Sequence, residues 1–286
     1  MTEFGNLSNH AVGVLLREMV RRAIESIQAQ QFDFEASEKS SPYRAGRDFV
    51  TSADLAAQAI YVHMITECLP GVGIIAEEDN LLVASTLPTP LWITVDPLDG
   101  TQAFMRRQSH GIGTMISLVN DQDVLSAYVG DAITREIYGF RPGSANVHRL
   151  SRGSNTIRLE IEEGLSLNQQ HALLHNEPRE FSKEAQELFL EPPHRIFKSF
   201  EITRGSIGME FTRLWKGEVG GIFIRPGSTT PWDFNPIFGI SRHMGFKFLR
   251  IASDGLHEVD MPVLLAVGAL EHELLVVHES RVHELS

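Results

Sequence analysis

Residues 92–101 constrain most strongly what this chain can fold into. They read Trp-Ile-Thr-Val-Asp-Pro-Leu-Asp-Gly-Thr, which predicts a buried strand that ends at Asp96, turns at Pro97 and presents a second acid, Asp99. Acids at a strand end, next to a glycine that lets backbone approach a ligand, can hold a hard cation against an anionic group. Asp-Pro and Asp-Gly are also common turn dipeptides. This stretch alone is compatible with a cation site or with a plain turn.

Acidic residues occur at three other places, each with an ordinary structural explanation. Residues 77–79 are consecutive acids after a short apolar run, where a solvated loop would accommodate them. Asp54 and Asp233 each lie in the first turn of a predicted helix, where a carboxylate is stabilised by about 0.3–1 kcal/mol. If the strands that lead to Glu77 and Asp96 are neighbours in one sheet, however, their acids form a single cluster. Turn chemistry explains such a cluster less well.

Composition bounds the class of protein. The chain has 286 residues, 42% of them hydrophobic, which is enough for one large domain or two lobes that share a core. It has 37 acidic and 25 basic residues and no basic stripe, so duplex nucleic acid is not expected as a partner. The single cysteine, Cys68, permits no internal disulfide. With no N-terminal signal pattern and no apolar run of about 20 residues, we expect a soluble cytoplasmic protein without a membrane partner.

Hydrophobic periodicity predicts two helices in the first 70 residues. Residues 12–27 have apolar side chains at helical spacing, with Asn6 or Ser8 as the N-cap. The polar residues 32–47 are expected to form a loop. A second helix begins at Ser52 and ends before Pro70. Its apolar side is predicted to consist of Leu55, Ala59, Val62, Ile65 and Leu69.

Strands and helices alternate along the rest of the chain, which favours a layered α/β fold. In the first half, further strands are predicted at residues 72–76, 111–119, 124–129 and 136–140. In the second half, predicted strands at 172–174, 195–199, 221–224, 247–251 and 263–267 alternate with helices at 182–190, 206–216, 231–243 and 271–278. A stretch rich in Ser, Gly and Asn near residue 150 predicts a boundary between two lobes, about 1–150 and 151–286, of a single domain that spans residues 1–286.

Together, the acidic elements resemble the ordered signature of the inositol monophosphatase family. They are Asp54 in Val-Thr-Ser-Ala-Asp, Glu77-Glu78, the Asp-Pro-Leu-Asp-Gly-Thr segment that begins at Asp96, and Trp232-Asp233. The similarity extends from about residue 47 to residue 246, which is most of the chain. The family comprises lithium-sensitive, magnesium-dependent phosphatases. The resemblance implies a layered αβαβα sandwich of the inositol monophosphatase and fructose bisphosphatase type, with the metal site between the lobes.

The resemblance also implies a set of metal ligands. They are the carboxylates of Glu77, Asp96, Asp99 and Asp233 and the backbone carbonyl of Leu98. Hard oxygen ligands of this kind suit Mg²⁺, two or three ions per site, with Mn²⁺ as a substitute. Glu78 is expected to hold these ligands in place without binding the metal itself. Bound cations would turn a cluster that repels phosphate into an anion site, which explains how an acidic protein can process an acidic substrate.

The implied reaction is hydrolysis of a phosphate monoester by a water molecule that the metal ions activate. By family correspondence, Asp54 and Thr101 orient and deprotonate that water. Gly100 and Thr101 would present backbone N–H groups to the phosphate oxygens. Gly205 and Ser206 resemble the family's Gly-Ser before a helix and are predicted to bind substrate.

Two departures from the family pattern concern the substrate pocket. Phe234-Asn235-Pro236 follows Asp233 where a small Ala-Gly pair is usual, and Pro236 either fits the predicted helix or kinks it. Arg225 or Pro226 lies near the position of the acid that binds inositol hydroxyls in the family. Arg225 there would favour a substrate with a further anionic group, or it is a surface residue. The substrate therefore stays open.

Two functions of different classes follow from the resemblance. The first is a Mg²⁺-dependent phosphatase of a small phosphorylated metabolite, an inositol phosphate or a related polyol or sugar phosphate. Histidinol phosphate and phosphoadenosine nucleotides are the alternatives within the family. The second is a non-catalytic homologue that acts as a binding module. The full ligand set, together with Asp54 and Thr101, favours the enzyme, because a binder has no chemical need for it. A homodimer and inhibition by lithium are further expectations from the family.

Overall fold

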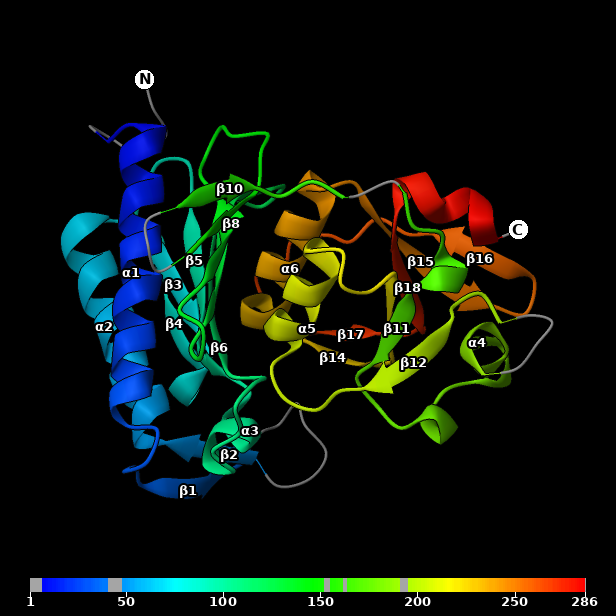
Figure 1. Cartoon of the computed structure of the whole chain (residues 1–286). Helices are drawn as coiled ribbons and strands as arrows, with labels where there is room; N and C mark the ends of the chain where they lie inside the picture. Colours follow the sequence, from blue (N-terminus) through cyan, green and yellow to red (C-terminus); the bar gives the residue numbers. More distant parts are fainter. Residues whose placement is uncertain (1–6, 41–47, 152–154, 162–163, 191–194, 286) are drawn as a thin grey trace.

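A computed structural model describes residues 7–40, 48–151, 155–161, 164–190 and 195–285. Its helices are α1 (Asn9–Ala29), α2 (Ser52–Cys68), α3 (Thr101–Met105), α4 (Lys183–Phe189), α5 (Ile207–Trp215) and α6 (Pro231–His243). Four short 3₁₀ helices lie at Glu78–Asn80, Leu167–Gln169, Pro178–Glu180 and Glu279–Leu285. The elements stack in five layers: α1 with α2, a first sheet, α5 with α6, a second sheet, and α4 (Figure 1). This is the αβαβα order that the resemblance implies.

The first sheet has eight strands in the order β10-β9-β8-β7-β6-β5-β3-β4. They are β10 (Thr156–Arg158), β9 (His148–Leu150), β8 (Ile137–Phe140), β7 (Val124–Asp131), β6 (Gly113–Val119), β5 (Trp92–Asp99), β3 (Gly73–Ala76) and β4 (Leu81–Val83). β3 and β5 are parallel neighbours, with Ala76 opposite Val95. Their carboxyl ends therefore meet at one edge, which places Glu77 beside Asp96 as the cluster hypothesis requires.

The second sheet has six strands in the order β12-β11-β13-β18-β15-β16. They are β12 (Ser199–Ile202), β11 (His171–Leu174), β13 (Gly221–Ile224), β18 (Leu274–His278), β15 (Phe246–Ala252) and β16 (Gly255–Glu258). Two short ribbons complete the strands: β1 (Ala36–Lys39) with β2 (Asp48–Thr51), and β14 (Gly227–Thr229) with β17 (Gly268–Leu270). The predicted lobe boundary near residue 150 stays a prediction; β10 extends the first sheet to Arg158.

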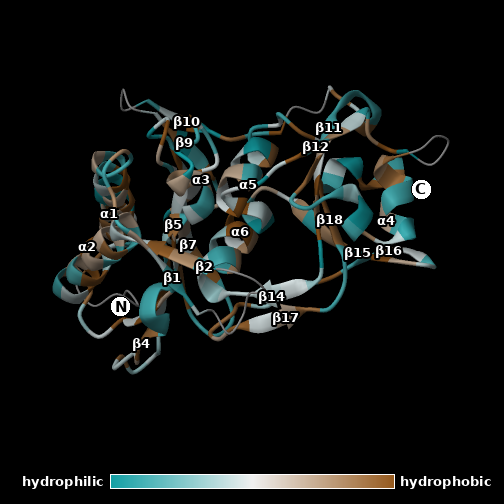
Figure 2. Ribbon diagram, turned by 90° about the horizontal axis from the view of Figure 1, so that it is seen from below, coloured by the Kyte–Doolittle hydropathy of each residue, from teal (hydrophilic) through white to brown (hydrophobic). Residues whose placement is uncertain are grey.

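Three hydrophobic cores hold the layers together. The first lies between α1, α2 and the first sheet, the second surrounds α5 and α6 between the sheets, and the third lies between the second sheet and α4. Successive side chains of a strand point to opposite faces. In β13, accordingly, Ile222 and Ile224 enter the second core and Phe223 enters the third. Brown apolar residues run along α1 and α2 in Figure 2, whereas the peripheral loops are largely teal.

The first helix confirms its prediction, since its apolar row is buried and Ser8 is the N-cap. Asn6, the other candidate cap, lies outside the described residues. Pro236 lies inside α6, which continues unbroken to His243, so this helix accommodates it. Among the described residues, no helix combines the length and apolar character needed to cross a membrane.

Three predicted elements in the second half are wrong. Residues 271–278 form no helix; instead β18 lies in the middle of the second sheet with both faces covered, so Leu274 to Val277 are all buried. A short apolar run of this kind has no period that distinguishes a strand from a helix. Residues 263–267 are irregular, and pairing with β14 begins only at Gly268. The strand predicted at 195–199 begins at Ser199, where pairing with β11 starts.

Two predictions in the first half also need correction. Part of the expected loop, Ala36–Lys39, is a strand that pairs with β2 over four residues; residues 41–47 lie outside the description. Pairing with a distant segment decided this, and a short polar strand has no hydrophobic pattern to reveal it. The predicted buried face of α2 is wrong, because Leu55 is 47% exposed whereas Asp54, Gln58 and Tyr61 face inward. The inner face of this helix includes the polar side chains of Asp54 and Gln58 among its apolar ones, so the hydrophobic pattern did not identify it.

We predict that Phe223→Ala destabilises the protein by about 3–5 kcal/mol, the usual range for a buried phenylalanine. The Phe223 ring is fully buried and contacts the rings of Phe181, Phe189 and Phe197 at centroid distances of 6.4, 5.0 and 5.9 Å. Urea unfolding measures the change. The control is Leu82→Ala, whose side chain is 69% exposed and whose truncation should change stability by about 0.5 kcal/mol or less. Equal effects of the two substitutions would contradict this description of the third core.

Candidate metal and phosphate site

An irregularity in β5 places Asp96 and Asp99 on the same face of the first sheet. Asp96 lies opposite Met115 of β6, and Asp99 lies opposite Gly113, so β5 has one residue more than its partner over this span. In a regular strand, residues three apart point to opposite faces. The extra residue of this β-bulge restores Asp99 to the side of Asp96. Pro97 fits the bulge because it has no N–H to donate to a ladder.

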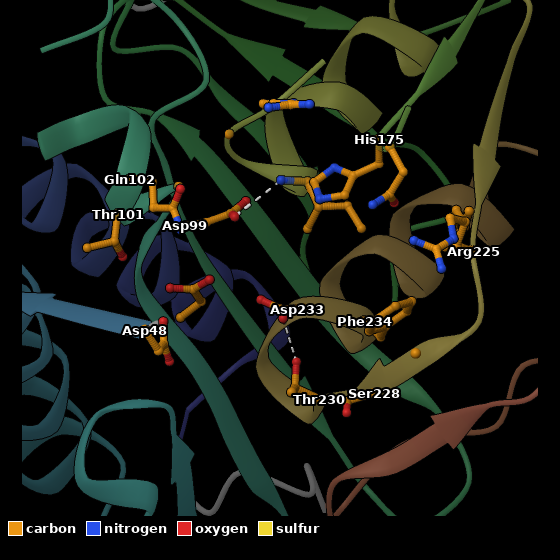
Figure 3. Close-up of a pocket in the computed structure, with 18 of the residues that line it drawn as sticks. Asp48, Asp99, Thr101, Gln102, His175, Arg225, Ser228, Thr230, Asp233 and Phe234 are labelled. Carbon is orange, nitrogen blue, oxygen red and sulfur yellow. Dashed lines mark hydrogen bonds between the residues drawn. The ribbon is translucent and has the colours of Figure 1, made fainter. Parts of the chain in front are cut away.

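A third acid, Asp233, reaches the same point from the second half of the chain. Asp233 lies in the first turn of α6, and Thr230 Oγ1 donates a hydrogen bond of 2.6 Å to its Oδ2. One carboxylate oxygen from each of Asp96, Asp99 and Asp233 lies within 4.8 Å of the others. These side chains are only 2%, 6% and 7% exposed. Figure 3 shows Asp99 and Asp233 facing each other across the cleft.

Asp99 also joins the first sheet to α5. Its carboxylate accepts a hydrogen bond from Ser206 Oγ and two more from backbone N–H groups, of Ile207 at 3.2 Å and Gly208 at 2.7 Å. These N–H groups belong to the first turn of α5, which has no intrahelical acceptors for them and carries the positive end of the helix dipole. Ser206, predicted as a substrate-binding residue, therefore contacts the carboxylate of Asp99 and is itself the N-cap of α5.

The electrostatics of the cluster favour a bound cation. Burial, followed by the charges of Glu77, Asp99 and Asp233, raises the pKa of Asp96 well above its usual value. Burial and the charge of Asp233 raise the pKa of Asp99 to about 7, even though its hydrogen bonds to Ser206 and Gly208 oppose the shift. Three carboxylates this close repel one another unless protons or cations intervene. Because the donors are all hard oxygens, the set fits a divalent cation such as Mg²⁺.

Glu77 extends the cluster toward β1. It lines the same cleft as Asp96, Asp99 and Asp233, and its Oε1 accepts a hydrogen bond of 3.0 Å from Lys39 Nζ. The same ammonium group donates to both carboxylate oxygens of Glu78 at 2.8 and 2.9 Å. Despite its burial, the pKa of Lys39 is raised, because Glu77 and Glu78 attract the charged form. Glu78 thus lies behind the cleft and contacts Glu77 through Lys39.

Asp54 and Thr101 lie together, as the resemblance implies. Thr101 Oγ1 donates to Asp54 Oδ1 at 3.1 Å and is also 3.2 Å from the carbonyl oxygen of Leu98. Asp54 is 1% exposed and forms a capping box with Thr51, whose N–H lies 2.8 Å from its Oδ2. Burial raises the pKa of Asp54, whereas the hydrogen bonds from Thr51 and Thr101 oppose this rise. Only Thr101 of this pair lines the cleft.

Gly100 occupies a position that no other residue fits. Its φ is +94°, in the left-handed region, and an added Cβ would lie 2.3 Å from the carbonyl oxygen of Gly111 and 2.8 Å from the amide nitrogen of Ser206. Both obstacles are backbone atoms, so neither can rotate away. The absent side chain lets the segment at Gly205 and Ser206 approach the end of β5.

The cleft around these residues has a volume of about 660 Å³ and continues outward past Arg225. Arg225 Nη1 donates to Glu180 Oε2 at 2.5 Å, and Arg204 is paired with Glu177. Arg225 therefore lines the cleft and faces a carboxylate there. Of the sequence-predicted site residues, Glu77, Asp96, Leu98, Asp99, Gly100, Thr101, Gly205, Arg225 and Asp233 line this cleft. Asp54, Glu78 and Ser206 lie directly behind it.

Sequence reasoning missed several residues that support the site. Lys39 lies in the segment that was expected to be a loop, and Gln58 holds Glu78 through two backbone hydrogen bonds of 3.0 Å. His175 lines the cleft and contacts Glu210 of α5. One signal could have revealed Gln58, since it follows Asp54 by one helical turn and therefore shares its face. The pairing of His175 with Glu210 joins distant parts of the chain and has no local signature.

Two curated relatives are similar to this chain. An inositol-1-monophosphatase of Caulobacter vibrioides is 29% identical over 126 residues, which cover 44% of this chain and 48% of the relative. The match thus spans about half the length of that relative. The Nus factor SuhB of Escherichia coli K12 is 27% identical over 209 residues, which cover 70% of this chain and 69% of SuhB.

The fold also matches a solved structure. An IMPase from Thermotoga maritima superposes with a TM-score of 0.69 at 17% identity, covering 94% of this chain and 92% of the other. At this identity the likeness shows the fold alone. The sequence model of the inositol monophosphatase family matches residues 9–283, nearly the whole chain. The protein therefore belongs to the inositol monophosphatase family.

Proposed function

We propose that this protein is a Mg²⁺-dependent phosphatase that hydrolyses a small phosphate monoester, an inositol phosphate or a related polyol or sugar phosphate. The observation that carries the proposal is the convergence of Asp96, Asp99 and Asp233 within 4.8 Å in a buried cleft that Glu77 also lines. Burying carboxylates that repel one another is costly. A cluster of acids assembled from two lobes is consistent with a site that binds divalent cations.

The proposed metal ligands are the carboxylates of Glu77, Asp96, Asp99 and Asp233 and the carbonyl oxygen of Leu98, which all belong to residues that line the cleft. They would hold two or three Mg²⁺, and Mn²⁺ could replace it. Bound Mg²⁺ supplies two kinds of chemistry: it lowers the pKa of water, and it neutralises negative charge on the phosphate and the leaving oxygen. The protein's part is to fix the ligands, which the bulge of β5 and the first turn of α5 do.

We assign Asp54 as the general base, which acts through the hydroxyl group of Thr101. Thr101 Oγ1 donates a hydrogen bond to Asp54 Oδ1. The lone pairs of the hydroxyl oxygen therefore stay available to accept a hydrogen bond from water in the cleft. When that water loses a proton to Thr101, the Thr101 proton can pass to Asp54. Burial raises the pKa of Asp54, which makes its carboxylate a stronger base. The backbone N–H groups of Gly100 and Thr101 are the proposed contacts of the phosphate oxygens.

The outer cleft would hold the alcohol portion of the substrate. Gly205 and Arg225 line it, and the volume of the whole cleft, about 660 Å³, suits a small metabolite. Arg225 is paired with Glu180, so the structure gives no support for a second anionic group of the substrate at this position. Histidinol phosphate and phosphoadenosine nucleotides are the alternatives that a panel of substrates would test.

The name of one relative, Nus factor SuhB, suggests a different candidate function, that of a non-catalytic partner. The arrangement of Asp54 and Thr101 favours the enzyme. Binding an anion requires ligands and cations, but it does not require a buried base hydrogen-bonded to a hydroxyl at the edge of the cleft.

We predict that purified protein releases phosphate from at least one small phosphomonoester when Mg²⁺ is present. Asp96→Asn should lower kcat/KM by roughly 10²–10³-fold or more, the scale for losing one electrostatic contributor to a transition state. A phosphate-release assay over inositol, sugar, histidinol and nucleotide phosphates measures this. The matched control is Asp121→Asn, an exposed acid in a turn, which should retain activity. Wild-type protein that is inert toward the whole panel with Mg²⁺ and Mn²⁺ would instead support the binding module.

The acid cluster also predicts how the stabilisation of the folded protein by Mg²⁺ depends on pH. The pKa of Asp96 is raised, and that of Asp99 is about 7, so between about pH 4 and pH 7 the native state binds more protons than the unfolded state. This contribution to stability is therefore lost as pH rises through that window. Mg²⁺ should replace the lost protons, so that it raises Tm more at pH 8 than at pH 5. Thermal melts with Mg²⁺ or EDTA test this, and an equal increment at both pH values argues against the proposed ligands.

The proposed base makes a separate prediction. Thr101→Val removes only the hydroxyl and should lower kcat by about 10²–10⁴-fold, the usual contribution of general base catalysis, while KM changes little. Thr101→Ser keeps the hydroxyl and should retain most of the activity. Steady-state kinetics of the two variants on the same substrate provides the comparison. Full activity of Thr101→Val would exclude this role for Thr101.

A further inference from the structure

His175 lies on the wall of the cleft where the alcohol portion of a substrate would be held. It directly follows the last residue of β11 and lines the same cleft as Asp99, Asp233 and Arg225. Its side chain is 36% exposed, so the ring is only partly covered by protein. Figure 3 shows the ring between Asp99 and Arg225. His175 thus lies on the outward side of the acid cluster.

A buried carboxylate fixes the orientation of this ring. His175 Nδ1 is 2.8 Å from Glu210 Oε1, and the carboxylate of Glu210, on α5, is 4% exposed. Thr203 Oγ1 donates to the same oxygen at 2.6 Å. The carboxylate accepts the Nδ1 proton, which turns Nε2, on the opposite edge of the ring, away from Glu210. The backbone beside His175 is fixed too, because Thr203 N–H donates to the carbonyl oxygen of Leu174 at 2.9 Å.

The charges around His175 indicate which kind of group it could bind. Among the residues of the second half of the chain that line the cleft, each basic side chain faces a carboxylate: His175 faces Glu210, Arg225 faces Glu180, and Arg204 faces Glu177. Arg106, which lines the cleft from the first half, donates to the carbonyl oxygen of Gln102. The wall thus combines donors and acceptors without a large excess of positive charge. Such a surface suits a neutral hydroxyl group better than a second phosphate, which would require cations that are not already paired.

We propose that His175 is a specificity-determining residue that hydrogen-bonds through Nε2 to a hydroxyl group in the alcohol portion of the substrate. Glu210 and Thr203 are positioning residues, which act by holding the ring. The proposal rests on the phosphatase function proposed above. It assigns His175 a task separate from that of the acid cluster, because the residue recognises the alcohol and takes no part in binding the metal ions.

The experiment compares two substrates and several variants with Mg²⁺ present. One substrate is a polyol phosphate, such as an inositol or sorbitol phosphate, and the other is p-nitrophenyl phosphate, whose alcohol portion has no further hydroxyl. For His175→Ala, the ratio of kcat/KM on the polyol phosphate to that on the aryl phosphate should fall by about tenfold or more, the scale for one hydrogen bond to a polarised group. His175→Gln, which can place an amide near the position of Nε2, should recover part of the ratio.

Two further variants provide a control for His175 and test whether Glu210 positions its ring or only stabilises the fold. His171→Ala changes a histidine four residues earlier, whose Nδ1 contacts Ser199 and which does not line the cleft, so the ratio should not change. Glu210→Gln should lower the ratio in the wild-type background but have little further effect in His175→Ala, because the two residues act as one unit. Glu210→Gln that lowers both activities equally in both backgrounds would assign Glu210 a purely structural role.

The outcomes distinguish this proposal from the function on which it rests. If wild-type protein hydrolyses neither substrate with Mg²⁺ or Mn²⁺, the phosphatase function fails and the role of His175 fails with it. If wild-type protein hydrolyses both substrates, and His175→Ala lowers the two activities by the same factor or not at all, only the role of His175 is overturned. Hydrolysis of the aryl phosphate alone also overturns it, since no hydroxyl recognition then exists.

Discussion

Mutual repulsion among Asp96, Asp99 and Asp233 is the constraint on which this structure depends. The three carboxylates are buried and lie within 4.8 Å of one another, and their burial, followed by their mutual repulsion, raises the pKa of Asp96 and Asp99. Such a cluster opposes folding at neutral pH unless positive charge compensates it. The surrounding elements supply part of that charge, through the first turn of α5 and the ammonium group of Lys39. Divalent cations would supply the rest.

Elements from both halves of the chain meet at this cluster, so the same contacts position the site and join the first sheet to α5. Asp99 belongs to β5 of the first sheet, yet its hydrogen bonds go to the start of α5 between the sheets. Gly100 lets the segment at Ser206 approach closely enough for these bonds to form. The bulge in β5 and the start of α6 then bring Asp96 and Asp233 to the same cavity. A change in the packing of α5 against the first sheet would therefore alter the geometry of the carboxylate cluster as well.

The sequence predicted the elements whose local pattern agrees with their tertiary role. The first helix has one apolar face and a serine cap, and α6 begins at Pro231 and ends at His243 as predicted. The ordered acids located the cluster because strand ends and helix starts leave recognisable signals. The family resemblance added the layered fold, which periodicity alone could not establish.

The failures have physical causes in particular residues. The inner face of α2 includes Asp54 and Gln58, whose polar groups contact Thr101 and Glu78 at the site, so the hydrophobic pattern indicated the wrong face. Leu274 to Val277 are buried on both sides of a strand and have no period. Lys39 and His175 contribute through partners far away in the sequence, Glu77 and Glu210, and only the fold brings these pairs together.

Anomalous scattering from crystals soaked in Mn²⁺ tests the central claim most directly, because it locates the cation independently of any activity. The account predicts at least one anomalous peak bounded by the carboxylates of Asp96, Asp99 and Asp233, with coordination distances typical of a hard divalent ion. Mn²⁺ bound only elsewhere, with this cavity unoccupied at saturating concentration, would contradict it.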